Sequence, residues 1–230
     1  MRYIFSLLLY LLSGLTFLIF GPFLLIVFFI YPKSLYLTVI PFCQLMITIF
    51  GCTIKSNKKV PLNETYVIMA NHVSFLDVFA IPSVFTGKFT AVAASKNFNI
   101  PVYATILKKL KVISIDRSNR AQSIKGIKQA ENLIQRGYHV VILPEGTRTE
   151  DGKLGPFKKG GFHLAVNTKT KILPIVTKGL FKIKPINRWT IIPGKITINV
   201  GVPIDSENKS VDNLLLETQT IFNKMLQNIK

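Results

Sequence analysis

The segment NHVSFLD, residues 71–77, places a histidine and an aspartate five positions apart. Histidine titrates near neutral pH, so His72 can take a proton from a hydroxyl group and later return one to a leaving group. A carboxylate at Asp77 would fix the tautomer of the ring and stabilise its protonated form. The two side chains meet only if a loop with His72 bends into a helix with Asp77, because this spacing within one helix puts them on different faces. On this pattern alone, a structural histidine in a loop explains the segment equally well.

Two arginines come directly after predicted strands. Arg117 ends the segment ISIDR, and Arg148 lies in the segment LPEGTRT. The planar guanidinium group of arginine can donate two parallel hydrogen bonds to one phosphate. Both arginines are therefore candidates for binding a phosphate group, and ion pairs inside the protein are the alternative. For Asp116 we favour an ion pair.

The turn before Arg148 holds two further candidates. Glu145 follows a proline immediately, at a place where its carboxylate could accept hydrogen bonds from substrate hydroxyl groups. Gly146 lets the backbone approach a ligand or adopt a positive φ. The sequence thus predicts that a second part of the site lies at the end of another strand.

A serine nucleophile is not required if His72 activates the hydroxyl of a substrate directly. We interpret Ser74 as a helix cap, and no G-x-S-x-G motif occurs in the chain, which makes a hydrolase the weaker alternative. His139 falls inside a predicted strand and His163 inside a predicted helix, so we expect both to be structural. No residues have the spacing of metal ligands, and we expect no metal.

Alternating strands and helices must position these candidates. Apolar and β-branched runs predict strands at 65–70, 89–94, 112–115, 138–143, 172–177 and 195–200. Helical periodicity and caps predict helices at 76–84, 102–110, 122–136, 161–166 and 211–229. This order predicts an α/β fold, with a single catalytic domain whose mostly parallel or mixed sheet is flanked by helices and preceded by N-terminal membrane helices. The chemistry should then lie in the loops that follow the strands.

The N-terminal part of the chain is apolar. Residues 3–31 contain no charge and exceed the roughly 20 residues that cross a bilayer. Gly21-Pro22 could kink or split this run. A second apolar stretch follows at 35–52, after a predicted turn at 32–34.

These stretches predict a hydrophobic membrane anchor of one or two helices at 1–53, followed by a catalytic domain at 54–230. The helices either form a hairpin across the bilayer or lie in one leaflet. We favour at least one span, because the first stretch lacks the polar face of an interfacial helix.

The positive charge of the chain lies behind this anchor. The formal net charge is +18, and all 11 acidic residues and all but two of the 29 basic residues follow residue 52. A basic domain behind an apolar anchor suits an anionic membrane surface. Nucleic acid is the alternative partner. It leaves the apolar anchor unexplained, so we expect no nucleic acid to bind.

Four segments resemble, in order and spacing, the four sequence blocks of the glycerophospholipid acyltransferase family. They are NHVSFLD, ISIDR, LPEGTRT and LPIV, and they most resemble those of bacterial 1-acyl-sn-glycerol-3-phosphate acyltransferases. The resemblance runs from about Val60 to Gly201, and the combination is far more specific than any single block. Two blocks depart from the family pattern, since Lys111 replaces the glycine that usually opens the second block and Leu143 replaces the phenylalanine that opens the third.

The resemblance implies transfer of a fatty acyl group to the free hydroxyl of 1-acyl-sn-glycerol-3-phosphate (lysophosphatidic acid), which gives phosphatidic acid for phospholipid biosynthesis. It implies that His72 is the catalytic base and Asp77 its partner. It assigns binding of the acceptor to Arg117, Glu145, Gly146 and Arg148. The implied donor is acyl-CoA or acyl carrier protein, with no other cofactor. The implied location is the bacterial inner membrane, with the catalytic domain on the cytoplasmic side.

Two other functions remain open at this stage. One is an acyltransferase for another lysolipid, such as a lysophospholipid or a lyso-ornithine lipid. The other is a non-catalytic basic membrane- or lipid-binding protein. The second accounts for the charge and the apolar anchor, but it gives no reason for His72, Asp77, Glu145 and Arg148 to follow strands.

Overall fold

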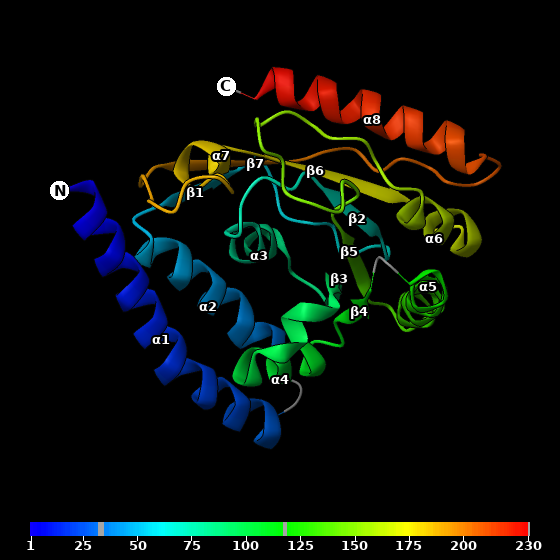
Figure 1. Ribbon diagram of the computed structural model, residues 1–230. Helices are drawn as coiled ribbons and strands as arrows, with labels where there is room; N and C mark the ends of the chain where they lie inside the picture. Colours follow the sequence, from blue (N-terminus) through cyan, green and yellow to red (C-terminus); the bar gives the residue numbers. More distant parts are fainter. Residues whose placement is uncertain (32–34, 117–118, 230) are drawn as a thin grey trace.

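Seven strands form one sheet in the order β1-β7-β6-β2-β5-β3-β4 (Figure 1). The structure is a computed structural model that describes residues 1–31, 35–116 and 119–229. The strands are β1 (Thr53–Ser56), β2 (Val67–Ala70), β3 (Phe89–Ala94), β4 (Ile113–Ile115), β5 (His139–Ile142), β6 (Ile172–Lys178) and β7 (Lys195–Val200). Neighbouring strands are parallel except β6 and β7. The predicted α/β fold with a mostly parallel or mixed sheet is confirmed.

The strand order brings two predicted parts of the site together. β2 lies between β5 and β6 and is parallel to both, with Ile68 opposite Val141 and Leu173. The carboxyl ends of parallel neighbours lie at the same edge of a sheet. The segment at 71–77 after β2 and the segment at 143–149 after β5 therefore leave the sheet side by side.

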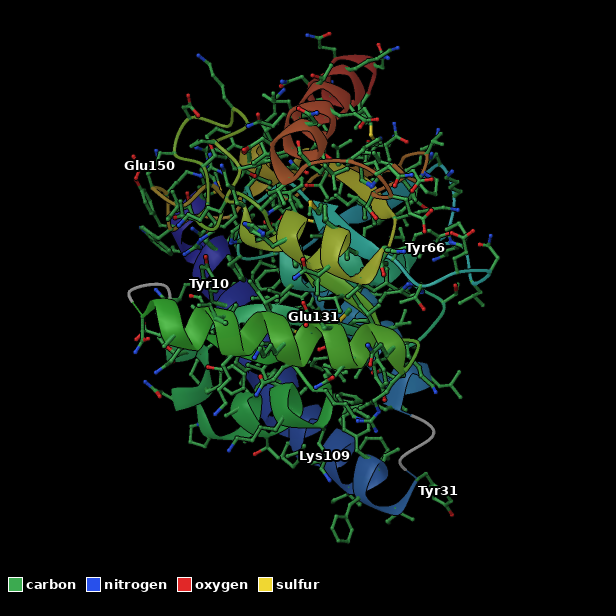
Figure 2. All side chains as sticks on the ribbon, turned by 90° about the vertical axis from the view of Figure 1, so that its right-hand side faces the viewer. Tyr10, Tyr31, Tyr66, Lys109, Glu131 and Glu150 are labelled. Carbon is green, nitrogen blue, oxygen red and sulfur yellow. The ribbon has the colours of Figure 1, made fainter. Side chains whose placement is uncertain are left out.

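Helices cover both faces of the sheet (Figure 1). One face carries α5 (Arg120–Gln135), α6 (Gly160–Thr168) and α8 (Val211–Asn228); the other carries α1 (Arg2–Ile30), α2 (Leu35–Ile49), α3 (Asp77–Ala80) and α4 (Pro101–Lys109). Along β2 successive side chains alternate between two cores: Val67 and Met69 join the α5, α6 and α8 side, and Ile68 and Ala70 join the other. This burial on both faces explains the continuous apolar run of that strand. Figure 2 shows α5 lying across the side of the molecule, with Glu131 midway along it.

Some elements differ from those that we predicted. The helix predicted at 76–84 is α3 followed by a 3-10 turn, η2 (Ile81–Val84), which contains a proline. A second 3-10 turn, η3 (Ser95–Asn99), precedes α4, and a short helix, α7 (Leu180–Ile183), follows β6. The edge strand β1 was not predicted; it pairs with β7 and begins at the last residue of the predicted anchor.

The first apolar stretch forms a single helix. α1 runs through Pro22 without a break, so Gly21-Pro22 does not split it. By length and composition α1 could cross a membrane, whereas α2 is only 15 residues long. The turn predicted at 32–34 lies outside the described residues.

α1 has two contrasting faces. Its buried side includes small or polar residues, namely Ser6, Ser13, Thr16 and Gly21, and the three hydroxyl groups donate to carbonyl oxygens one turn earlier. Small side chains let neighbouring elements approach closely. The outward side carries large apolar side chains, including Leu8, Leu11, Leu15, Leu18, Phe23 and Ile26.

The protein contacts α1 along its length. Near the start of the helix, Ser6 accepts a hydrogen bond from the backbone N–H of Ile191 at 3.0 Å. Farther along, Gly21 lies so close to Val102 of α4 that an added Cβ would sit 3.0 Å from it. Near the end, the ammonium group of Lys109 lies 5.6 Å from the ring centre of Phe29. α1 therefore packs against the catalytic domain as part of a common core.

Candidate active site

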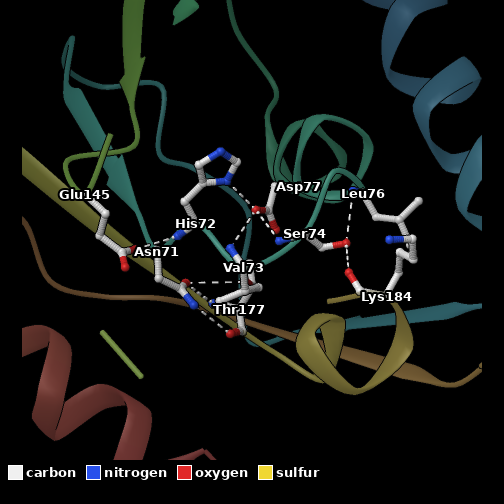
Figure 3. Close-up of polar contacts among 9 residues, drawn as sticks. All are labelled: Asn71, His72, Val73, Ser74, Leu76, Asp77, Glu145, Thr177 and Lys184. Carbon is white, nitrogen blue, oxygen red and sulfur yellow. Dashed lines mark hydrogen bonds and ion pairs between the residues drawn. The ribbon is translucent and has the colours of Figure 1, made fainter. Parts of the chain in front are cut away.

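The loop after β2 bends into α3 and brings His72 and Asp77 together (Figure 3). The distance from His72 Nδ1 to Asp77 Oδ2 is 2.7 Å. α3 begins at Asp77 itself, so His72 lies in the loop and the five-residue spacing does not separate the side chains. This is the loop-to-helix arrangement that the sequence required.

The carboxylate of Asp77 is held in place from three directions. Besides the imidazole, Oδ2 accepts the backbone N–H groups of Val73 at 2.9 Å and Ser74 at 3.0 Å. An ionised carboxylate only accepts hydrogen bonds, so Nδ1 of His72 carries the proton and Nε2 is left as the basic nitrogen. The side chain of Asp77 is fully buried, whereas that of His72 is 19 % exposed. A substrate hydroxyl can therefore reach the ring from solvent.

Glu145 supports the backbone of His72. Its Oε1 accepts the N–H of His72 at 2.7 Å, and its Oε2 accepts the N–H of Gly155 at 2.8 Å. Figure 3 shows this carboxylate meeting the backbone of His72 while the imidazole ring turns toward Asp77. Burial raises the pKa of the Glu145 carboxyl, and the two N–H groups act in the opposite direction. In this structure Glu145 positions the histidine loop, and its contact with an acceptor stays a prediction.

Two more contacts fix the end of β2. The carbonyl oxygen of His72 accepts the N–H of Thr149 at 3.0 Å. The amide side chain of Asn71 accepts the N–H of Thr177 at 2.7 Å and donates to the carbonyl of the same residue at 3.0 Å. Asn71 opens the motif NHVSFLD, but its residue type alone did not predict this role. Hydrogen bonds thus join the first sequence block to the third and to Thr177, the residue that follows the fourth.

Gly146 occupies a position that only glycine fits easily. Its φ is +76°, and an added Cβ would lie 3.0 Å from Cε of Lys158. Left-handed backbone and a crowded neighbour both disfavour a side chain. The tight turn after β5 therefore accounts for this glycine, and contact with the acceptor stays a prediction.

Arg148 lies in a pocket next to the histidine loop. The pocket has a volume of about 510 Å³. It is lined by Tyr10, Phe75, Arg148, Lys184, Ile186, Asn187 and Trp189, and we call it the cationic pocket. Phe75 belongs to NHVSFLD, so the pocket borders the catalytic segment. Arg117, the other predicted phosphate ligand, lies outside the described residues.

The other candidates have structural contacts. The buried hydroxyl of Ser74 donates to the carbonyl of Lys184 at 2.8 Å and accepts the N–H of Leu76 at 3.3 Å. It therefore braces the start of α3, although Leu76 occupies the N-cap position. His139 is buried in β5, where Nδ1 accepts the N–H of Tyr66 at 3.1 Å and burial lowers its pKa. His163 is exposed on α6.

The structure explains why a lysine, Lys111, can stand where the second block of the family usually has a glycine. Lys111 has a φ of +57°, which is left-handed backbone that favours glycine. Its carbonyl accepts the hydroxyl of Thr90 at 2.7 Å, and its ammonium group lies 4.9 Å from the ring centre of Tyr138. These contacts hold a lysine where the family pattern has a glycine.

Comparison with known proteins identifies the family of this chain. A family model described as Acyltransferase matches residues 51–178. The chain is 31 % identical over 153 residues to a chloroplastic 1-acyl-sn-glycerol-3-phosphate acyltransferase of Brassica napus, which covers 66 % of this chain and 44 % of that protein. It is 29 % identical over 169 residues to the alpha form of the mouse enzyme, with 72 % and 59 % covered. The chain spans about half the length of the relatives that it matches.

A solved structure shares the whole fold. The crystal structure of the 1-acyl-sn-glycerophosphate acyltransferase from Thermotoga maritima superimposes with a TM-score of 0.85. It covers 100 % of this chain and 99 % of that one, at 24 % sequence identity. The common architecture therefore includes the two N-terminal helices as well as the sheet.

Proposed function

The chain belongs to the glycerophospholipid acyltransferase family, and we propose that it transfers a fatty acyl group from an acyl thioester to the free hydroxyl of 1-acyl-sn-glycerol-3-phosphate. The product would be phosphatidic acid. The observation that carries the proposal is the contact of 2.7 Å between His72 Nδ1 and the buried carboxylate of Asp77. It leaves Nε2 basic and accessible, as a base toward a hydroxyl group requires.

His72 takes the proton of the acceptor hydroxyl as its oxygen attacks the carbonyl carbon of the thioester. A carbon–oxygen bond forms, the carbon–sulfur bond breaks, and the proton passes from Nε2 to the departing thiolate. Asp77 stabilises the imidazolium in between, because its Oδ2 already faces Nδ1. The step balances with donor and acceptor alone, so we propose no cofactor. Acyl-CoA and acyl carrier protein are both suitable donors.

Arg148 is the proposed contact for the acceptor phosphate. It is half-buried in the cationic pocket, beside Phe75 of the catalytic segment. A guanidinium group there can hold the phosphate while the hydroxyl of the same lipid faces His72. Arg117 is proposed for the same role on the strength of its sequence block.

We further propose that α1 lies at a membrane surface with its outward face among the lipids. Most of its large apolar side chains face away from the protein, and its buried side combines small residues with Leu9, Leu24 and Phe28. The contacts at Ser6, Gly21 and Phe29 keep the whole helix against the basic catalytic domain. A helix that crossed the bilayer would extend away from that domain and would lose most of these contacts. The packing therefore favours the single-leaflet alternative over the span that hydropathy favours.

This arrangement can be tested by labelling. Single cysteines placed at Arg2 and Tyr31, at the two ends of α1, should react with a water-soluble thiol reagent from the same side of sealed vesicles, in a chain whose two buried cysteines are replaced. Labelling from opposite sides would establish a span. Bacterial inner-membrane location and a cytoplasmic catalytic domain are tested by the same reagent on intact cells and on inverted vesicles.

The reaction itself is tested by changing the base. His72→Ala should lower acyl transfer by about 10³-fold or more, because a positioned base contributes roughly 10²–10⁴ to the rate. Product mass and thiol release from the thioester measure this. His163→Ala, which changes an exposed histidine on α6, should retain full activity. Substantial transfer by a folded, membrane-bound His72→Ala chain would refute the assignment, and no transfer by the unaltered chain would favour a non-catalytic lipid-binding protein.

A further inference from the structure

Lys184 is a buried charge in the wall of the cationic pocket. The residue is 8 % exposed, and its ammonium group donates to the carbonyl of Pro185 at 2.8 Å. An ammonium group has three donors, and a buried charge is costly unless an opposite charge pairs with it. Within residues 1–31, 35–116 and 119–229, no carboxylate forms an ion pair with Lys184. The lysine therefore lacks the partner that its burial requires.

Two arginines add to the positive charge around Lys184. Burial lowers the pKa of Lys184, and the charges of Arg148 and Arg188 lower it further. Arg188 donates to the carbonyls of Lys182, Ile183 and Thr190, so it braces the loop after α7. Arg148 and Lys184 are the two cations that line the pocket. A bound anion would stabilise such a pair of adjacent cations.

Lys184 also contacts the segment NHVSFLD. The hydroxyl of Ser74 donates to the carbonyl oxygen of Lys184 at 2.8 Å (Figure 3). The ammonium group of Lys184 lies 5.9 Å from the ring centre of Phe75. Ser74 and Phe75 follow His72 by two and three residues. An anion on Lys184 would therefore have a defined place relative to His72.

We propose that Lys184 is an acceptor-binding residue and that, with Arg148, it selects acceptors whose head group is a phosphate monoester. The inference rests on the proposed function, because it concerns the acceptor of that reaction. A phosphate monoester carries about −1.5 to −2 at neutral pH and matches two cations. A phosphodiester carries one negative charge, and a lyso-ornithine lipid has no phosphate. The pocket therefore selects against the other lysolipids considered from the sequence.

The kinetic test compares three variants with the unaltered full-length protein. Lys184→Met keeps an unbranched chain in the pocket but removes the charge. It should raise the KM for 1-acyl-sn-glycerol-3-phosphate about 10-fold or more, which is the usual scale for a charge-assisted hydrogen bond. The kcat and the KM for the acyl thioester should change little. Lys184→Arg should restore most of the loss, and Lys182→Met, which changes an exposed lysine nearby, should behave like the unaltered protein.

The selectivity between two acceptors gives a second measurement, which would not change if Lys184 had only a structural role. Lys184→Met should lose activity toward the phosphate monoester while its activity toward 1-acylglycerol, which lacks the phosphate, stays the same. An unchanged KM would overturn the inference. An equal loss with both acceptors would also overturn it, because Lys184 would then serve only the fold.

A binding experiment separates this inference from the proposed reaction. Binding of 1-acyl-sn-glycerol-3-phosphate is measured in the His72→Ala background, with and without Lys184→Met. Weaker binding on loss of the lysine supports the anion site even if the unaltered chain transfers no acyl group. Equal binding refutes the site even if transfer is confirmed.

Discussion

The histidine half of the site, formed by His72, Asp77 and Glu145, differs from the cationic pocket in how its charged side chains are paired. Around His72, the carboxylates of Asp77 and Glu145 accept hydrogen bonds from five groups of the protein. In the pocket, the carbonyl of Pro185 is the only hydrogen-bond acceptor for the Lys184 ammonium group among the described residues. In the histidine half the protein itself supplies the partners of the charged groups, whereas the proposed counter-charge of Lys184 is the phosphate of the acceptor.

This difference matches the separate requirements of proton transfer and of acceptor recognition. Proton transfer needs a base whose tautomer and position are set before the substrate arrives, and internal hydrogen bonds supply this. Recognition of an acceptor needs charge that the protein itself does not neutralise. Changes in the histidine half should therefore lower kcat, whereas changes in the pocket should raise the KM for the acceptor.

The largest effect is expected from Asp77→Asn. The imidazole and the N–H groups of Val73 and Ser74 all donate to Oδ2, so the asparagine oxygen can take this place and accept all three. The amide lacks the negative charge that stabilises the imidazolium, so kcat should fall about 10³-fold or more. Initial rates at saturating acceptor measure this, with the exposed Asp212→Asn as control. A variant that keeps a tenth of the activity would contradict this role for Asp77.

A smaller effect is expected from Glu145→Gln. One oxygen can still accept an N–H group, but the NH₂ group faces the other donor, at His72 or Gly155. An unsatisfied buried donor costs about 1–3 kcal/mol, so the melting temperature should fall and kcat should drop by about 10- to 100-fold.

The KM for the acceptor distinguishes positioning from binding in this variant. An unchanged KM means that Glu145 acts through the backbone of His72. A large rise in KM with kcat intact would instead establish the direct contact with the acceptor that the sequence block implies. Glu150→Gln, in the same segment but exposed, is the control.

The smallest effect is expected at Lys111, which belongs to neither half. Lys111→Gly and Lys111→Ala both remove the contact with Tyr138, but only glycine relieves the left-handed φ of +57°. The glycine variant should be more stable than the alanine variant by about 1 kcal/mol. Urea unfolding in detergent measures this. The kcat and KM of both variants should match those of the unaltered chain, and a change in either would show that the two halves do not contain all functional residues.

Much of the fold was predictable because its signals are local. The strands at β3 and β7 were predicted with their observed bounds, since apolar runs ended by polar residues mark buried strands. β1 was missed because Thr53–Ser56 has alternating exposure at a sheet edge and only four residues. Lys184 was not singled out because its surroundings include Ser74 and Phe75, which lie far away in the chain.

The residue types and their spacing along the chain indicate which chemical groups this protein can use. The blocks around His72, Arg148 and the LPIV segment indicate the family and the reaction, because those residue types have few other uses in that combination. Which side chains meet within the site follows from the tertiary structure alone. The carboxylate of Glu145 accepts the N–H of His72, and α1 packs against the rest of the protein, and neither contact could be predicted from the sequence. The physical reason is that hydrogen-bond partners and packing neighbours are set by where distant strands and helices meet, and the local pattern of residues does not contain that information.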